Sequence, residues 1–542
     1  MRKFFGNTRL MLYSIGTGLL LWLSWPPSGF PFLIFLAMVP LFLAEERIFK
    51  NRDAFHPLSL FFYAWLAFFV WNVLTTWWIM YASFPGMVMA VVLNSFFMAI
   101  PWGLMHYSRR ILPGKQGPVS LIILWMTFEF LHTRWDMSWS WLDLGNAFAA
   151  YPSWIQWYEY TGASGGTLWI LIMNLLIFSL LKQILENKAA TRLLVFRAAL
   201  VAAFFVVPAI ISFAIKSGYS ESIDPVEVVV IQPNQDPYDQ AKTREEVMRR
   251  IGHMIELADK KVTPSTRYVV APEGASPRGI WQHEDENHPT VRAIRQHLEK
   301  HPQLSWVIGS FSYKMYRPAD PVPNTARQYA DSDRYYDAFN SAIMVSPGQP
   351  VQYYHKSMLV PGIERMPFFT ILRPLGQLVE SFGGISGSLG RQDHRSTFIA
   401  NENEKVAAPI CYESIYGDYM RDFIRDGAGL IFIITNDGWW RDTPGYRQHH
   451  QYARLRAIES RRSIARSANT GISSFIDQKG NIIKQTNWWE PDAIRATLNQ
   501  NQKITYFTRN GNYLGQLSFF LTVLLILYMI SRKLMRGKRL GQ

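Results

Sequence analysis

The chain has 542 residues, of which 49% are hydrophobic and only 18% are charged. Its formal net charge is nevertheless +14, because 55 Lys and Arg residues outnumber 41 Asp and Glu residues. The aromatic content excludes a disordered chain, and the single cysteine, Cys411, excludes an intramolecular disulfide. A basic excess of this kind is typical either of nucleic-acid binding or of the loops that flank membrane spans.

Long segments almost free of charge favour membrane spans, since about 20 apolar residues cross a bilayer as a helix. The predicted spans are 10–25, 30–44, 58–80, 85–107, 118–133, 166–185, 194–215 and 513–531. The first two are short, and a buried hairpin is the alternative for them. The first could also be a signal peptide, but Trp25-Pro26-Pro27 follows it instead of a small-residue cleavage site, so a retained helix is expected.

Lys and Arg residues are concentrated at the two termini and in every second loop between the predicted spans. Segments 1–9, 45–56, 108–117, 182–197 and 532–542 hold 18 Lys and Arg residues and four acids, which accounts for the whole net charge. By the positive-inside rule both termini are cytoplasmic, and eight crossings fit this. Residues 217–511 then lie on the far side of the membrane, which is the periplasm in a Gram-negative bacterium. The net charge therefore indicates membrane topology, and no basic excess remains that would indicate nucleic-acid binding.

Residues 217–511 have the composition of an ordinary globular domain. Apolar runs at 226–232, 268–271, 306–310, 342–345, 406–410, 430–435 and 472–476 are predicted as strands, and 239–262 and 444–468 as helices. This alternation predicts an α/β sandwich. Three parts are therefore expected: a membrane domain at 1–216 with about seven transmembrane helices, an extracytoplasmic domain at 217–511, and a final transmembrane helix with a basic tail at 512–542.

Three motifs each place a reactive residue at the end of a predicted strand. They are VAPEG with Glu273, YHKS with Lys356 and PICYES with Cys411. A cysteine at a strand-to-helix elbow is expected to be exposed, with a pKa lowered by helix N-terminal amides. A glutamate can take the thiol proton, and a lysine can stabilise the thiolate and a developing oxyanion. These are the groups needed for acyl transfer through a thioester.

Each of these residues alone is weak evidence, since a lone cysteine after a strand is usually a buried small hydrophobe. No zinc-ligand spacing surrounds Cys411, and His449-His450 are expected to be structural or near substrate, so no metal is predicted. The Arg-rich 444–468 helix could contact phospholipid headgroups or form a salt-bridged face with Glu459. Glu129, within the fifth apolar segment, is a functional candidate or simply reaches water near the outer end of its span.

Together the motifs resemble those of the carbon–nitrogen hydrolase (nitrilase) superfamily, which uses a Glu-Lys-Cys triad in this chain order. The resemblance covers residues 225–500, including TNDGWW at 435–440 and the stretch 448–473. Such a domain before the last of eight spans resembles the apolipoprotein N-acyltransferase family over nearly the whole chain. The implied fold is a polytopic α-helical membrane bundle of about eight spans plus a nitrilase-like αββα sandwich.

The resemblance implies a ping-pong reaction in the bacterial inner membrane, with no cofactor. Cys411 would attack an acyl ester of a phospholipid, typically phosphatidylethanolamine, to form a thioester. The α-amine of a diacylglyceryl-Cys apolipoprotein would then accept the acyl chain in the last step of lipoprotein maturation. Glu273 matches the family's general base, and Lys356 matches the residue that stabilises the tetrahedral intermediate.

Four further residues match supporting positions of the family. Glu364 matches an acid near the site, Glu413 would orient the triad, and the backbone N–H of Tyr412 would complete the oxyanion hole. Tyr238 stands where some members have a tryptophan. Ile363 and Ala271 depart from the Gly-Glu and Trp-Pro-Glu patterns of better-known members, so the loops that gate lipid entry are expected to differ in shape.

Two other functions stay open. A membrane-tethered amidase or nitrilase would use the same triad with water as the acceptor, but it would need one anchor rather than eight spans. A membrane receptor with an inactive nitrilase-like domain would not need an intact set of Glu273, Lys356 and Cys411.

Overall fold

The computed structural model describes residues 5–112, 116–186, 191–239, 241, 243–329, 332–368, 388–401 and 404–540. The chain forms two compact units, one made of Met1–Met80, Phe84–Gly218 and Asn510–Gln542 and the other of Tyr81–Ser83 and Tyr219–Arg509. Parts of four predicted cytoplasmic segments, at 1–4, 113–115, 187–190 and 541–542, lie outside the described residues.

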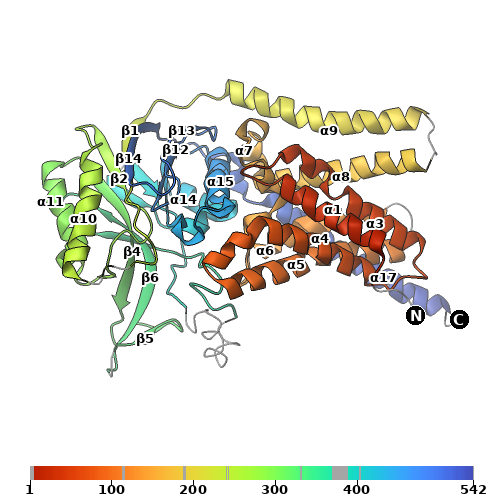
Figure 1. Cartoon of the computed structure of the whole chain (residues 1–542), viewed down its shortest axis with the longest axis horizontal. Helices are drawn as coiled ribbons and strands as arrows, with labels where there is room; N and C mark the ends of the chain where they lie inside the picture. The colour runs from red at the N-terminus through yellow and green to blue at the C-terminus, as the bar shows by residue number, and fades with distance from the viewer. Residues whose placement is uncertain are drawn as a thin grey trace. The chain divides into compact units, whose positions relative to one another are not determined.

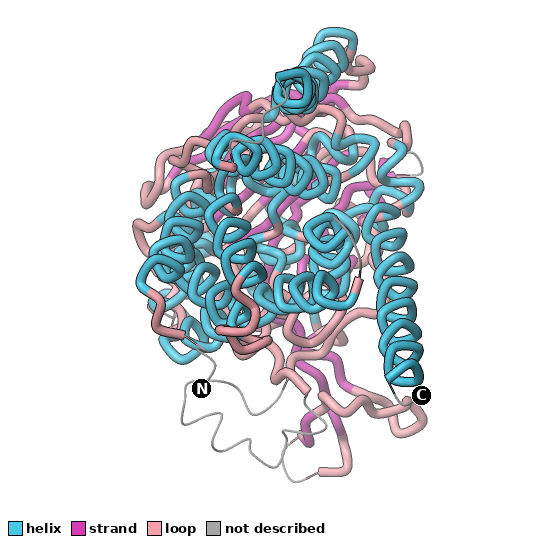
Figure 2. Tube along the Cα trace, turned by 90° about the vertical axis from the view of Figure 1, so that its right-hand side faces the viewer, coloured by secondary structure: helices cyan, strands magenta, loops and turns pink. Residues whose placement is uncertain are grey.

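The first unit is helical (Figure 1). Its main helices are α1 Thr8–Leu23, α3 Val39–Lys50, α4 Ser59–Thr76, α5 Phe84–Ile111, α6 Gln116–His132, α8 Ala163–Leu185, α9 Thr191–Gly218 and α17 Tyr513–Leu540. Figure 2 views many of them end-on, as a bundle. Within the described chain, 5 helical segments are long and apolar enough to cross a membrane: Ser59–Tyr81, Phe84–Ile111, Ala163–Leu185, Thr191–Gly218 and Tyr513–Met535.

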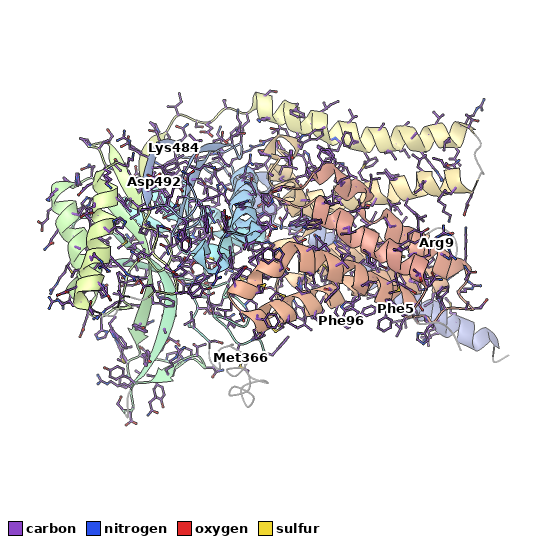
Figure 3. All side chains as sticks on the ribbon, in the orientation of Figure 1. Phe5, Arg9, Phe96, Met366, Lys484 and Asp492 are labelled. Carbon is purple, nitrogen blue, oxygen red and sulfur yellow. The ribbon has the colours of Figure 1, made fainter. Side chains whose placement is uncertain are left out.

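Two shorter apolar helices, Thr8–Leu23 and Gly117–His132, accompany them. Large apolar side chains lie exposed on the outside of these helices, among them Phe96 on α5, which is 44% exposed (Figure 3). Apolar residues on the outer face of a helix fit a surrounding of lipid rather than water.

The predicted span at 30–44 is wrong as a single helix. The chain there forms a 3₁₀ turn, then the short helix α2 Ile34–Ala37, and α3 begins only at Val39. Pro40, in the first turn of α3, has no N–H for a continuous helix. The side chain of Asn174 on α8 fills the break: its Oδ1 accepts the Met38 N–H at 2.8 Å, and its Nδ2 donates to the Ile34 carbonyl at 2.8 Å. An amide group thus replaces one rung of the helical hydrogen-bond ladder, which interrupts the helix.

Glu129 on α6 does not reach water, so that alternative is wrong. Its carboxylate is buried and accepts hydrogen bonds from the Trp125 indole at 2.8 Å, the Leu144 N–H at 2.9 Å and the Thr167 hydroxyl at 2.7 Å. These donors come from α6, from the 3₁₀ segment Leu144–Phe148 and from α8. The acid therefore ties three parts of the bundle together, as expected for a buried polar group satisfied by hydrogen bonds.

The second unit contains two β-sheets. The first has the order β14 Asp492–Asn499, β1 Pro225–Gln232, β2 Thr266–Val270, β4 Ser305–Met315, β6 Tyr335–Val345 and β5 Arg327–Gln328, with β3 Ile280–Trp281 on β4 and β7 Gln352–His355 on β6. The second has the order β13 Ile482–Gln485, β12 Ser474–Ile476, β11 Ile464–Ala468, β10 Leu430–Thr435, β9 Glu404–Ala407 and β8 Phe398–Asn401.

The two sheets pack face to face. The rings of Tyr268 on β2 and Phe432 on β10 lie 5.1 Å apart, and the Ser467 hydroxyl on β11 donates to the Ile231 carbonyl on β1 at 2.8 Å. Helices α10 Arg244–Asp259 and α11 Pro289–Lys300 cover the first sheet with a buried apolar cluster that includes Ile251. Helix α15 Pro444–Ser460 packs on the second sheet beside α14 Gly417–Arg425. The predicted combination of a helical bundle and an αββα sandwich is confirmed.

The predicted helix at 444–468 is too long. Helix α15 ends at Ser460, where Arg461 adopts a left-handed conformation with φ 50° and its N–H donates to the Ala457 carbonyl. The following residues 464–468 form strand β11, in which every residue is buried. A strand buried on both faces lacks the alternation of polar and apolar residues, so periodicity alone does not separate it from a helix.

Four arginines of this region are buried, namely Arg456, Arg461, Arg462 and Arg466, so these side chains do not form a headgroup-binding face. The alternative, a salt bridge with Glu459, is present. Arg456 pairs with Glu459 at 3.1 Å, and both side chains are buried. Arg462 donates to the carbonyls of Ala428 and Lys503 at 2.7 and 2.8 Å. These guanidinium groups therefore bind the backbone of the domain core. A guanidinium suits this role because it carries several N–H donors in a fixed geometry.

Candidate active site

The three predicted reactive residues each follow a strand of the second unit. Glu273 follows β2, Lys356 follows β7 directly, and Cys411 begins the 3₁₀ helix Cys411–Ile415. Residue Ile410 bridges to Ile434 on β10 in parallel, so the cysteine lies at the carboxyl end of the second sheet. Side chains at the carboxyl ends of parallel strands commonly converge in α/β folds.

Lys356 and two carboxylates form a buried ionic cluster. Its Nζ lies 3.2 Å from Glu273 Oε1 and 2.8 Å from Glu364 Oε1, and the lysine side chain is 1% exposed. Burial opposes a charge on the lysine, but the two carboxylates outweigh burial and raise the pKa of Lys356 well above its usual value. The site therefore contains a permanent buried cation.

Asn340 on β6 joins the two carboxylates, and sequence reasoning missed it. Its Nδ2 donates to Glu273 Oε1 at 2.7 Å and to Glu364 Oε1 at 2.9 Å. The backbone carbonyl of Asn340 accepts the backbone N–H of Lys356 at 2.8 Å. The second oxygen of Glu273 accepts the Asn436 N–H at 3.1 Å. A signal for Asn340 exists in the sequence, because it is one of three polar residues, with Asp337 and Ser341, inside this strand.

Gly309 on β4 permits the backbone of Glu273 to approach the sheet. A Cβ at position 309 would lie 2.5 Å from the Glu273 Cα and 2.6 Å from the Pro272 carbonyl oxygen. The Gly309 N–H also donates to that carbonyl at 3.1 Å. The glycine is thus required by close backbone packing rather than by its torsion angles.

The expectation that Cys411 is exposed, with a lowered pKa, is wrong. The residue is 9% exposed, and burial, followed by the charge of Glu273, raises the pKa of the Cys411 thiol well above its usual value, although Lys356 acts in the opposite direction. The elbow itself is present, because Cys411 has φ 49°. A protonated thiol beside a carboxylate needs that carboxylate as a general base before it can attack.

Glu413 connects the segment of Cys411 to the segment of Lys356. Its buried carboxylate accepts the Ser357 N–H at 2.7 Å, the Ile410 N–H at 2.8 Å and the Tyr354 hydroxyl at 2.7 Å. Hydrogen bonds from both segments fix their separation. This geometry suits the orienting role that the resemblance implies for Glu413.

The two tyrosines occupy different places. The side chain of Tyr412 turns toward Tyr416, whose hydroxyl donates to the Tyr412 hydroxyl at 2.6 Å. Tyr238 is 54% exposed and lies beside Trp439, with ring centroids 5.2 Å apart. The structure thus brings Glu273, Lys356 and Glu364 into direct contact, ties Glu413 to the backbone beside Lys356, and places Tyr238 with Trp439.

The histidine pair 449–450 is buried on α15. His450 Nε2 lies 2.9 Å from the Ser474 hydroxyl, and His449 Nδ1 lies 3.0 Å from Asp437 Oδ1. The pair therefore belongs to hydrogen-bond networks inside the domain. The contacts of His449 extend to the backbone carbonyl of Cys411.

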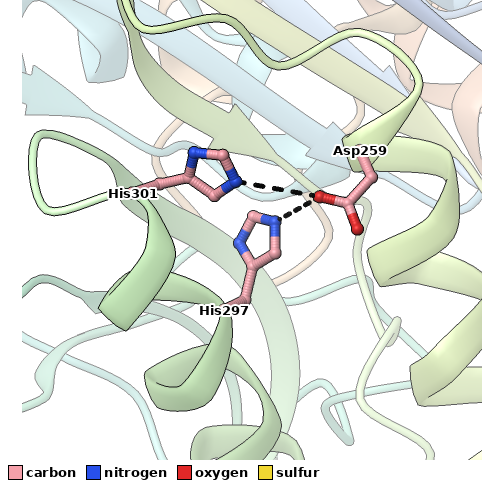
Figure 4. Close-up of side chains that lie close together, drawn as sticks. All are labelled: Asp259, His297 and His301. Carbon is pink, nitrogen blue, oxygen red and sulfur yellow. Dashed lines mark hydrogen bonds and ion pairs between the residues drawn. The ribbon is translucent and has the colours of Figure 1, made fainter.

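Among the described residues, Asp259, His297 and His301 have their potential metal-binding atoms within 4.8 Å of one another (Figure 4). The Trp306 indole N–H, which can only donate, faces His297 Nδ1 at 3.2 Å. Nε2 of His297 then carries the proton and donates it to Asp259 Oδ1 at 2.8 Å. A metal would need the lone pair of Nε2, so this group fits a hydrogen-bond relay and not a metal site.

Comparison with known proteins gives matches over both units of the chain. Residues 17–176 match the family model of the apolipoprotein N-acyltransferase N-terminal domain, and residues 227–505 match that of the carbon-nitrogen hydrolases. Apolipoprotein N-acyltransferase of Chlorobaculum tepidum is 28% identical over 535 residues, which cover 95% of this chain and 96% of the relative. Apolipoprotein N-acyltransferase 1 of Treponema denticola is 24% identical over 565 residues, covering 98% of each chain.

A solved structure is also similar to part of the chain. It is that of Saccharomyces cerevisiae Nit3, a member of branch 10 of the nitrilase superfamily, which is 17% identical. The alignment covers 52% of this chain and 93% of Nit3, with a TM-score of 0.35.

Proposed function

The chain belongs to the apolipoprotein N-acyltransferase family, a membrane-embedded branch of the carbon–nitrogen hydrolases, and on this premise we propose that it N-acylates lipoproteins through a thioester at Cys411. The acyl donor is a phospholipid, with phosphatidylethanolamine as the first candidate. The acceptor is the α-amine of a diacylglyceryl-Cys N-terminus. The enzyme lies in the bacterial inner membrane with both termini cytoplasmic and the second unit periplasmic, in accordance with the charge pattern.

In the first half-reaction, Glu273 takes the proton from Sγ of Cys411 as Sγ attacks the carbonyl carbon of the phospholipid ester. The carbonyl oxygen becomes an oxyanion, which Lys356 and the Tyr412 N–H stabilise. The ester C–O bond then breaks, and Glu273 returns the proton to the departing oxygen. The products are a lysophospholipid and an acyl thioester on Cys411.

In the second half-reaction, the free amine of the lipoprotein attacks the thioester carbon, and Glu273 removes a proton from the attacking nitrogen. The same groups stabilise the second oxyanion. The C–S bond breaks, an amide forms, and the proton returns to Sγ. The elementary steps conserve atoms and charge, so no further reactant is needed.

The observation that carries this proposal is the buried Lys356 shared by Glu273 and Glu364 beside Cys411. A single carboxylate facing a buried ammonium would be held ionised and would be a weak base. Here Glu364 shares the lysine, so the ammonium of Lys356 is not paired with Glu273 alone. The lysine stays charged and ready for the oxyanion.

The test uses the purified full chain, phosphatidylethanolamine labelled in its acyl chain, and a diacylglyceryl lipopeptide with a free N-terminus. We expect label to reach the lipopeptide as an amide and to be absent with Cys411→Ala. Transfer by Cys411→Ala would contradict the assignment of the nucleophile. Release of free fatty acid alone, with the lipopeptide present, would identify a hydrolase with water as the acceptor.

A further inference from the structure

The carbonyl group of Cys411 faces a buried polar network of side chains. The Ser414 hydroxyl donates to this carbonyl oxygen at 2.8 Å, and His449 Nε2 lies 3.2 Å from the same oxygen. His449 Nε2 also lies 3.0 Å from the Ser414 Oγ. The carbonyl can only accept, and Ser414 uses its own proton on that carbonyl, so both contacts require a proton on Nε2.

The imidazole ring of His449 is itself held in place. Its Nδ1 lies 3.0 Å from Asp437 Oδ1, and Arg466 Nη2 lies 2.6 Å from Asp437 Oδ2. The three side chains are at most 1% exposed. Burial opposes ionisation of Asp437, but Arg466 and His449 outweigh burial and hold the pKa of Asp437 below its usual range. Arg466 Nη2, which can only donate, also lies 3.2 Å from His449 Nδ1. The guanidinium and the ionised carboxylate of Asp437 together fix the ring from behind.

The peptide bond between Cys411 and Tyr412 connects this network to the reaction. The carbonyl of Cys411 and the N–H of Tyr412 belong to one planar trans peptide, so they point in opposite directions. A donor that fixes the carbonyl therefore also fixes the direction of the N–H. Cys411 has φ 49°, a conformation that a residue with a side chain keeps only when its surroundings enforce it.

We propose that His449, supported by Asp437 and Arg466, is a positioning residue that aims the Tyr412 N–H at the oxyanion. The proposal rests on the function proposed above, in which that N–H stabilises the tetrahedral intermediate. His449 does not touch the substrate. It acts through the Cys411 carbonyl, and Ser414 provides a second donor to the same oxygen.

The proposal separates two reactions of the same thiol. Acylation of Cys411 passes through an oxyanion and depends on the direction of the Tyr412 N–H. Alkylation by iodoacetamide displaces iodide at a carbon atom, forms no oxyanion, and reports only the thiol and its base. Since Cys411 is the only cysteine of the chain, both reactions can be followed at this residue without labelling elsewhere.

The experiment compares His449→Gln with His449→Asn in the full chain, with His450→Asn as the matched control. A glutamine amide extends far enough to donate to the Cys411 carbonyl, whereas an asparagine amide reaches only the level of Nδ1 and keeps the contact with Asp437. His450 is equally buried but contacts Ser474 on β12. Single-turnover acylation by phosphatidylethanolamine, its KM and the alkylation rate are measured for each protein.

We expect His449→Asn to slow acylation by about 10²-fold, the usual cost of a lost oxyanion donor, with KM and alkylation unchanged. His449→Gln should recover most of the rate, and His450→Asn should resemble the wild type. Equal losses in the two His449 variants, or a parallel fall in alkylation, would overturn the proposal. If His449→Asn does not fold, Ser414→Ala removes the other donor and must slow acylation selectively; an unchanged rate would overturn the proposal.

The outcomes also distinguish this inference from the proposed function. No thioester in the wild-type protein would refute both. A thioester in the wild type that forms at the same rate in His449→Asn would refute only the role of His449.

Discussion

Replacing Glu364 by Gln removes one of the two carboxylates that share the buried Lys356. Glu273 lies 3.2 Å from the lysine Nζ, and at an effective dielectric constant of about 20 this pair attracts by about 5 kcal/mol. In Glu364→Gln the attraction is no longer shared, so a proton transfer from Cys411 to Glu273, which would end this attraction, is expected to cost more energy.

We expect about half of this energy, about 2.5 to 3 kcal/mol, to appear in the acylation barrier, which is a factor of about 10² in rate. Glutamine cannot simply replace the carboxylate, because Glu364 accepts from Lys356 and Asn340 on one oxygen and from the Val360 N–H on the other. A glutamine has one acceptor oxygen, so one of these donors must face an NH₂ group.

The assay measures the rate of single-turnover acylation of the full chain at saturating phospholipid. The melting temperature of each protein is measured in parallel. Glu404→Gln is the matched control, because Glu404 pairs with Arg267 at 3.0 Å on the partly exposed side of the domain. A surface pair of this kind contributes little, so the control should keep its rate. An unchanged acylation rate in Glu364→Gln, or a loss confined to KM, would refute the argument about the shared lysine.

Three further predictions concern packing and protonation. Gly309→Ala should abolish most activity and lower stability by about 1–3 kcal/mol, because the new Cβ meets the Glu273 backbone at 2.5 Å. Because the pKa of the Cys411 thiol is raised, its alkylation rate should keep rising with pH through the ordinary thiol pKa of about 8.5. Burial lowers the pKa of His355 to about 4, so acid should destabilise the fold. Below about pH 6.5 the unfolded chain binds a proton at this histidine that the folded chain does not bind. The free energy of unfolding should therefore fall by up to about 1.4 kcal/mol per pH unit.

Each of these has its own control. Gly252→Ala on α10, where a Cβ meets nothing within 4 Å, should be neutral or stabilising, and comparable damage there would contradict the packing argument. A plateau of alkylation below pH 8.5 would contradict a raised thiol pKa. For His355, the melting temperatures of the wild type and His355→Gln are compared from neutral pH down to about pH 4; parallel curves would contradict the linkage.

The sequence motifs predicted those site residues that are indicated by the residues next to them in the chain. Glu273 and Cys411 each stand shortly after an apolar run, and Lys356 stands directly after the short strand β7, so all three lie where a strand ends and a side chain can project into a site. Glu364 and Glu413 follow within a few residues of two of these motifs. The fold class could be predicted for the same reason, because apolar periodicity and loop charge are local properties.

The partners that act across the fold could not be predicted in this way. Asn340 bridges the two carboxylates from the middle of β6, and Asp437, His449 and Arg466 meet from three different elements. Nothing along the chain indicates that these residues are neighbours. The two wrong elements have different causes. Pro40 within the chain and Asn174 from another helix interrupt the predicted second span. Strand β11 is buried on both faces, so its pattern is not that of a half-exposed strand.

The central claim is that Cys411 carries the acyl chain between the two half-reactions. The most direct measurement is the intact mass of the full chain after incubation with phosphatidylethanolamine, before and after addition of a diacylglyceryl lipopeptide. We predict a mass increase of one acyl chain on Cys411 that hydroxylamine removes and that the lipopeptide discharges as an amide. A lipopeptide that becomes N-acylated while the enzyme never gains this mass, or does so with Cys411→Ala, would contradict the claim.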